Sequence, residues 1–117
     1  MITRYAEFVG TVHAGKEDAF FRFVEETLVP LWLKFDGAVD VTVSRELGRD
    51  EGAPSIPLLL AISYPDEEAL ERAMACDARF QSREETKRLL TMFDGTVYHR
   101  VTTSISRKPG PALSGML

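Results

Sequence analysis

The sequence predicts an α+β protein in which helices cover one face of a four-stranded antiparallel sheet. Alternation of apolar and polar residues marks strands, 3.6-residue periodicity marks helices between them, and Gly, Pro and Asp mark the boundaries. The resulting order, βαββαβ, is the ferredoxin-like arrangement. We expect one such domain over residues 1–107 of the 117-residue chain, followed by a flexible Pro- and Gly-containing tail over residues 108–117.

The first half of the chain reads as strand, helix, strand, loop and strand. Residues 3–13 alternate as in a strand, and residues 16–29 have the periodicity of a helix. Pro30 cannot donate a backbone N–H, so we expect that helix to kink or stop near Val29. Residues 38–47 alternate cleanly and predict a half-buried strand, followed by a polar loop over residues 48–55.

The second half begins with a nearly continuous apolar segment. Residues 56–64 predict a central strand covered on both faces. A helix is expected to start at residues 65–68, where acidic side chains suit the positive end of the helix dipole, and its pattern breaks near Asp77. Ser82 and Glu85 have capping-box spacing, which predicts a second short helix that runs to Met92.

The last strand is expected over residues 96–106, after a turn at Asp94 and Gly95. We expect the first and last strands to lie on opposite edges of the sheet. Helices would cover one face only, yet both faces carry apolar side chains, for example Leu58 and Leu59. An exposed apolar sheet of this size favours association, so we expect two copies to pack sheet against sheet as a two-fold dimer with a space between them.

Composition excludes several classes of function. The chain has 14 Lys and Arg against 18 Asp and Glu, and this balance of −4 argues against a nucleic-acid partner. Its longest apolar run, residues 57–62, is far shorter than the roughly 20 residues that span a bilayer, so we expect no membrane partner. Cys76 is the single cysteine, which excludes an intrachain disulfide and favours a cytoplasmic location.

Three stretches, residues 8–23, 29–37 and 60–97, together resemble the dimeric α/β barrel proteins. The nearest types are the EthD-like and antibiotic-biosynthesis-monooxygenase-like small proteins, and the resemblance covers nearly all of residues 2–106. It implies a ferredoxin-like homodimer. It also implies a group of activities that includes cofactor-free oxygenases, isomerase-like and decarboxylase-like enzymes, and haem-degrading enzymes. Some of these relatives use a histidine on or near the first helix, whereas residues 24–30 contain none.

Four residues are candidates for catalysis. His13 ends the first strand and His99 lies in the last, and either could transfer a proton at a cavity mouth because histidine titrates near neutral pH. Each could equally be a strand-end residue with a local hydrogen bond. Glu7 or Asp40 in an apolar cavity would have a raised pKa and could act as a base. The alternative is that both belong to a polar, dimer-contacting face.

Other residues are candidates for substrate binding. Trp32 and Phe35, beside Pro30, could wall a pocket entrance or simply pack in the core. Cys76 is interpreted as a structural thiol, and residues 79–88, which mix both charges, as a solvated helical face. If the odd-numbered face of the first strand points away from the helices, the space between two sheets would be lined by Tyr5, Glu7, Asp40, Thr42, Tyr98 and Arg100.

These features lead to two hypotheses of function. The first is a cofactor-independent oxidoreductase or monooxygenase-type enzyme that acts on a small apolar organic substrate, with O₂ as a co-substrate. No nucleotide-binding or metal-binding motif is visible, so we expect no cofactor and no metal. The second is a non-catalytic metabolite-binding or accessory protein. RNA binding through the sheet is disfavoured, because residues 56–62 lack the aromatic and basic signature it needs.

Overall fold

The computed structural model describes residues 1–110. The tail predicted for residues 108–117 therefore lies mostly outside the described residues, and its flexibility stays a prediction. The elements are β1 (Ile2–Val12), α1 (Glu17–Phe23), the π-helical segment η1 (Val24–Leu28), α2 (Val29–Trp32), β2 (Asp40–Arg45), β3 (Leu58–Tyr64), α3 (Glu67–Met74), α4 (Asp77–Leu89), the 3-10 turn η2 (Leu90–Met92) and β4 (Phe93–Thr103).

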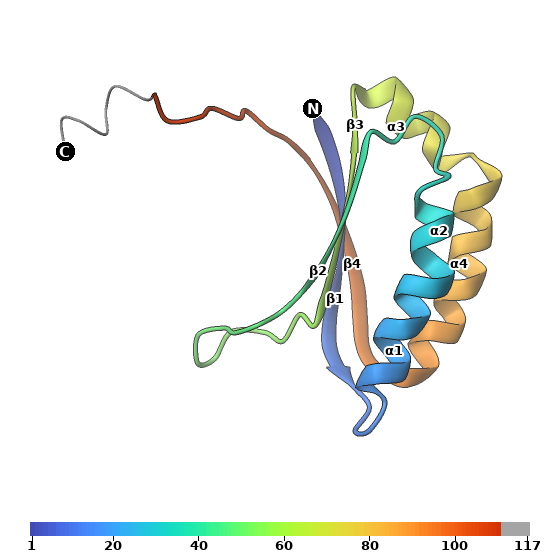
Figure 1. Ribbon diagram of the computed structural model, residues 1–117, viewed down its shortest axis with the longest axis vertical. Helices are drawn as coiled ribbons and strands as arrows, with labels where there is room; N and C mark the ends of the chain where they lie inside the picture. The colour runs from blue at the N-terminus through green and yellow to red at the C-terminus, as the bar shows by residue number, and fades with distance from the viewer. Residues whose placement is uncertain (111–117) are drawn as a thin grey trace.

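The strands form a four-stranded antiparallel sheet in the order β2-β3-β1-β4, with the helices on one face (Figure 1). This confirms the predicted ferredoxin-like α+β fold. The expectation that the first and last strands lie on opposite edges is wrong, because β1 pairs with β4 along its whole length and Ala6 lies opposite His99. Each helical connection crosses over one strand, which leaves β1 and β3 in the centre and β2 and β4 at the edges.

The hydrophobic core lies between the sheet and the helices. Even-numbered residues of β1 and β3 point toward the helices and are buried there, as Phe8 and Leu58 show at 2% and 0% exposure. They pack against one face of the segment that runs from α1 to α2. The buried residues of that segment are Phe20, Val24, Leu28 and Trp32.

The opposite face of the sheet carries no helix, and we call it the helix-free face. It contains the odd-numbered residues of β1 and β3, including Tyr5, Leu59 and Ala61, which are half-buried within one chain. Thr3 and Ser63 share a hydrogen bond of 2.8 Å on this face. β3 is a central strand, as predicted, but one chain covers only one of its two faces with helices.

Pro30 widens the first helix instead of ending it. The Val29 backbone N–H donates to the Val24 carbonyl, five residues back, so the turns of η1 are wider than α-helical turns. Proline has no N–H and its ring crowds the carbonyl four residues earlier, and a wider turn relieves both problems. The predicted irregularity is therefore present over Val24–Leu28, and the helix continues to Trp32.

The capping box predicted at Ser82 is wrong. α4 begins five residues earlier, at Asp77, with Cys76 at its N-cap, and Ser82 lies buried inside the helix. Its hydroxyl donates to the Arg79 carbonyl at 2.8 Å instead of capping a helix start. Serine commonly bonds to the preceding turn in this way, so the spacing alone is ambiguous.

The turn predicted at Asp94 and Gly95 is also wrong, because both residues lie inside β4. Gly95 pairs with Gly10 of β1, and a side chain on either glycine would collide with the backbone of the other strand. Gly10 has a φ of 152°. The two glycines therefore allow a close approach of two strands, where the sequence pattern indicated a chain reversal.

Candidate functional site

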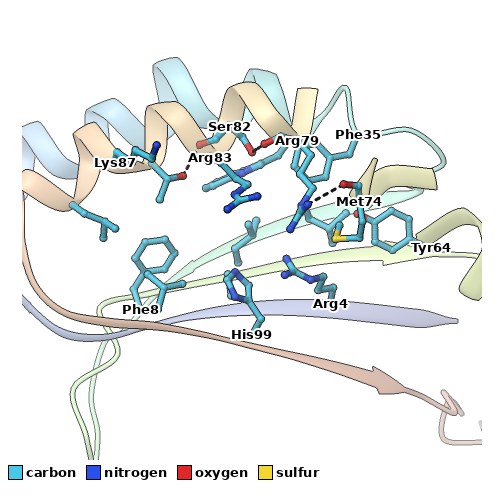
Figure 2. Close-up of a pocket in the computed structure, with 17 residues that line it drawn as sticks. Arg4, Phe8, Phe35, Tyr64, Met74, Arg79, Ser82, Arg83, Lys87 and His99 are labelled. Atoms are coloured by element: carbon cyan, nitrogen blue, oxygen red, sulfur yellow. Dashed lines mark hydrogen bonds between the residues drawn. The ribbon is translucent and has the colours of Figure 1, made fainter. Parts of the chain in front are cut away.

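The main cavity lies between the helix-covered face of the sheet and α4, inside a single chain (Figure 2). Its volume of about 290 Å³ is near the lower end of the range for small-molecule pockets. The apolar part of its wall combines sheet residues with residues of the helices and of the turn after α2. These residues are Ala6, Phe8, Trp32, Phe35, Leu60, Ile62, Met74, Leu90 and Val97.

One face of α4 presents three cations to this cavity. Arg79, Arg83 and Lys87 are spaced four residues apart and therefore lie on one side of the helix. Figure 2 shows the Arg79 and Arg83 side chains reaching from α4 toward the sheet. The interpretation of residues 79–88 as a solvated face holds for Arg83, Lys87 and Arg88, which are exposed, and Arg88 pairs with Glu85 at 3.0 Å. It does not hold for Arg79, which is half-buried in the cavity wall.

His99 lies at the mouth of the cavity, on the edge strand β4. Its side chain is exposed, and it points toward the cavity opposite Arg83 in Figure 2. Desolvation by the surrounding protein lowers the pKa of His99, and the positive charges of Arg4, Arg79 and Arg83 lower it further. The imidazole is therefore neutral at pH 7 and free to accept a proton.

Tyr64 closes the cavity at the end of β3. The residue is 0% exposed, and its hydroxyl has no hydrogen-bond partner among residues 1–110. Burial raises the pKa of Tyr64 to about 12, with Arg4 acting in the opposite direction. The phenol is therefore a protonated donor at neutral pH. A buried hydroxyl without a partner costs free energy, so this group is poised to bond to a ligand or to water.

Six of the sequence-predicted residues lie on the helix-free face, as expected from their strand positions. There the Arg100 guanidinium donates to Glu7 Oε1 at 2.9 Å, and Thr42 donates to Asp40 at 3.0 Å. This face points away from the cavity, so the cavity lining excludes Tyr5, Glu7, Asp40, Thr42, Tyr98 and Arg100. Their role in a space between two sheets stays a prediction.

The two remaining candidates, His13 and Trp32, lie in different parts of the fold. His13 lies just beyond β1, with Nε2 3.1 Å from an Asp94 carboxylate oxygen, and it is not part of the cavity lining. Trp32, in contrast, is both a core residue and a cavity wall, with 3% exposure. The cavity thus brings together His99 and Trp32 from the sequence-predicted set and leaves His13 outside.

Sequence reasoning missed the cationic and phenolic groups of the cavity. The signal for Arg79, Arg83 and Lys87 was present, since their spacing of four marks one helix face. The acidic residues Glu84 and Glu85 stand between these cations in the sequence, and the mixture of charges led to the interpretation of a solvated face. For Arg4 and Tyr64 no such signal existed, because only the fold determines that the ends of β1 and β3 meet under α4.

Two further classes of site find no support in the described part of the chain. Residues 1–110 contain no group of three or more side chains suited to hold a metal ion. No helix within the same residues has the length and apolar character that a bilayer crossing requires.

Comparison with known proteins identifies the fold. No family model matches this sequence, and no curated protein does. An EthD family protein of Bacillus halodurans has a similar structure, with a TM-score of 0.67 and 21% identity, over 90% of this chain and 100% of that one. SnoaB of Streptomyces nogalater, a cofactor-independent oxygenase, also has a similar structure. Its TM-score is 0.63 at 19% sequence identity, over 93% of this chain and 97% of that one. The predicted resemblance to EthD-like and antibiotic-biosynthesis-monooxygenase-like proteins is therefore confirmed at the level of the fold.

A third solved structure also has a similar fold. A putative antibiotic biosynthesis monooxygenase of Deinococcus radiodurans gives a TM-score of 0.63 at 13% identity, over 93% of this chain and 97% of that one. In all three cases nearly the whole of both chains is superimposed. The chain therefore shares the ferredoxin-like fold of these proteins over nearly its whole length.

Proposed function

We propose that this protein is a cytoplasmic, cofactor-independent oxygenase-type enzyme that acts on a small apolar organic molecule inside the cavity under α4. The observation that carries the proposal is an apolar cavity with a neutral histidine, His99, at its mouth and cations around it. The structural likeness to SnoaB supports the reaction type.

We assign separate roles to the apolar wall and to the polar groups of the cavity. The aromatic and aliphatic wall, including Phe8 and Trp32, would bind the apolar substrate and exclude water. His99 would accept a proton from an acidic C–H group of that substrate. Arg83, which lies opposite His99, would stabilise the resulting carbanion or enolate, because a cation held near the reacting carbon interacts favourably with developing negative charge.

The reaction balances without a further reductant. The substrate anion would add O₂, and protonation of the adduct by the His99 imidazolium would give a hydroperoxide. Loss of one water would then convert the original CH₂ group into a ketone. One substrate and one O₂ give one ketone and one water, and His99 returns to its neutral form.

O₂ consumption tests this proposal directly. A panel of phenols, hydroquinones and anthrone-type compounds would be incubated with the purified protein, with an oxygen electrode and mass spectrometry as readouts. His99→Gln should lower the rate by about 100-fold or more, the usual size of a general-base effect. His13→Gln is the matched control and should leave the rate unchanged, because His13 lies outside the cavity. Binding of the panel without O₂ uptake would favour the metabolite-binding alternative.

We also propose that two copies associate through the helix-free face. Two segments project from that side of the sheet in Figure 1, the loop between β2 and β3 and the chain after β4. They carry Leu47 and Ile105, which are 101% and 82% exposed. Tyr98, on the face itself, is 53% exposed. Apolar side chains held away from the core in this way fit a second copy of the sheet.

A further inference from the structure

The cavity contains positive charges that the protein does not neutralise. Arg4, Arg79 and Arg83 line it, and none of the three forms an ion pair within residues 1–110. Lys87, the fourth cation of the wall, pairs with Glu84 at 3.0 Å. No Asp or Glu is part of the cavity lining. Like charges spaced four residues apart on a helix are unfavourable, and an anion bound in the cavity would offset them.

The cations approach one point from both walls of the cavity. Arg4 extends from β1, and Arg79 extends from α4 toward it (Figure 2). Burial lowers the pKa of Arg4, and the positive charge of Arg79 on the opposite wall lowers it further. Arg79 is held in position by a hydrogen bond of 2.9 Å from Nη1 to the Met74 carbonyl.

A neutral donor lies beside these cations. The Tyr64 hydroxyl is buried and has no hydrogen-bond partner among the described residues, and its pKa responds to the charges of both Arg4 and Arg79. Apart from the bond of Arg79 Nη1 to the Met74 carbonyl, these two guanidinium forks and the phenol form a set of donors that a ligand acceptor can satisfy. A carboxylate accepts up to four such hydrogen bonds and matches the planar guanidinium geometry.

We propose that the cavity binds an organic carboxylate, with the carboxylate held by Arg4, Arg79 and the Tyr64 hydroxyl and the apolar body lying against Phe8, Trp32 and Ile62. This proposal rests on the proposed function, since it names the chemical class of the molecule that the enzyme takes. Arg83 and His99 lie further along the cavity, next to the apolar body, where a C–H group would be activated.

The test compares a charged probe with its neutral isostere. 3-Phenylpropanoate and 3-phenylpropanamide have nearly the same shape and differ in charge, and both fit a cavity of about 290 Å³. Trp32 is the only tryptophan of the chain and lies in the cavity wall, so its fluorescence reports binding. The carboxylate should bind roughly 10-fold or more tightly than the amide, as expected for a charge-assisted hydrogen-bond pair.

Two variants identify the groups that bind the carboxylate. Arg79→Gln and Arg4→Gln should each weaken binding of the carboxylate about 10-fold and change binding of the amide less than about 2-fold. Arg4 makes no hydrogen bond to the rest of residues 1–110 through its side chain, so its variant tests binding even if Arg79→Gln disturbs the end of α3. Arg88→Gln removes the same charge from the outer side of α4 and should change neither affinity.

A second readout comes from the two histidines. A bound carboxylate would offset the charges of Arg4 and Arg79 that face His99 from β1 and α4, and so raise the pKa of His99 measured by NMR. The amide should not do this. His13, paired with Asp94 outside the cavity, serves as the internal control, and its NMR signals should not respond to either probe.

The outcomes separate the two proposals. Equal binding of amide and carboxylate, or equal effects of Arg79→Gln and Arg88→Gln, would overturn the carboxylate site and leave the apolar substrate pocket in place. Failure of both probes to change Trp32 fluorescence at millimolar concentration would overturn the carboxylate site together with the proposed function.

Discussion

Tyr64 combines a fully buried ring with a hydroxyl that bonds to nothing in the described structure. A buried polar group without a partner destabilises the folded state, so Tyr64→Phe should raise the free energy of unfolding by about 1 kcal/mol at neutral pH. The same variant should bind 3-phenylpropanoate more weakly. Urea denaturation and Trp32 fluorescence measure the two effects. A loss of stability would show that the hydroxyl has a partner in the folded protein.

The pH dependence of stability gives a second prediction for Tyr64. Its pKa in the folded protein is about 12, above the ordinary value of 10.0, so the folded state keeps a proton that the unfolded chain releases. The protein should therefore lose stability as pH rises from 10 toward 12. Tyr64→Phe should lack this part of the loss. Identical alkaline denaturation curves for the two proteins would contradict the raised pKa.

His99 should affect the pH dependence of stability in the opposite direction to Tyr64. Its pKa is lowered below 6.5 in the folded protein, so the unfolded chain binds more protons in that range and stability should fall as pH decreases below 6.5. The reaction should lose rate over the same range, because protonated His99 cannot act as a base. A pH–rate profile of the wild-type protein measures this. A rate that rises on acidification would exclude neutral His99 as the base.

At the scale of elements, the pairing of β1 with β4 depends on two facing glycines. A side chain at Gly10 would collide with the backbone of Asp94 and Gly95, and the φ of 152° disfavours any other residue. Gly10→Ala should therefore cost at least about 2 kcal/mol of stability. Gly48→Ala is the matched control, because a Cβ there would meet nothing within 4 Å. Thermal denaturation followed by circular dichroism compares the two, and equal melting temperatures would contradict the close approach.

α4 shows how one helix serves two environments. Its outer face carries pairs such as Glu85 with Arg88 at 3.0 Å, which contribute little to stability at an exposed surface. Its inner face combines the buried Leu89 with Arg79 and Arg83, which line the cavity. Arg83 is exposed, whereas Arg79 is half-buried, and the proposed carboxylate ligand would offset the charge of Arg79.

At the scale of the whole molecule, the helix-free face predicts association. Tyr98→Arg places a charge on this face and should convert the dimer into a monomer in sedimentation velocity at micromolar concentration. Leu33→Arg is the control, because Leu33 is 66% exposed and follows α2 on the helical side. It should leave the dimer intact. A wild-type protein that is monomeric under these conditions would overturn the proposed dimer.

The cavity, in contrast, lies on the helix-covered side of the sheet, away from the helix-free face. A monomeric variant such as Tyr98→Arg should therefore still bind 3-phenylpropanoate with wild-type affinity. This separates the two whole-molecule proposals, since the dimer and the binding site can fail independently.

The sequence by itself determined the elements and their order. Period-two patterns in residues 3–13 and 38–47 predicted β1 and β2. Successive side chains of a strand point to opposite faces, so a half-buried strand has alternating apolar and polar residues. The apolar segment 56–64 predicted the central strand β3. Two predictions were wrong because the same local sequence occurs in two kinds of structure. Ser82 has the spacing of a helix cap but lies inside α4, where its hydroxyl bonds to the Arg79 carbonyl. Asp94 and Gly95 are typical turn residues, but Gly95 lies in β4 against the backbone of β1.

Only the tertiary structure decided where the functional groups meet. The neighbouring positions of β1 and β4 place His99 beside Arg4, although the two residues are far apart in the sequence. The direction in which α4 faces the sheet places the half-buried Arg79 and the exposed Arg83 in the cavity wall. Periodicity specifies which residues share a face, but strand order and helix packing arise from contacts between distant segments. Those contacts placed the cavity on the helix-covered side of the sheet.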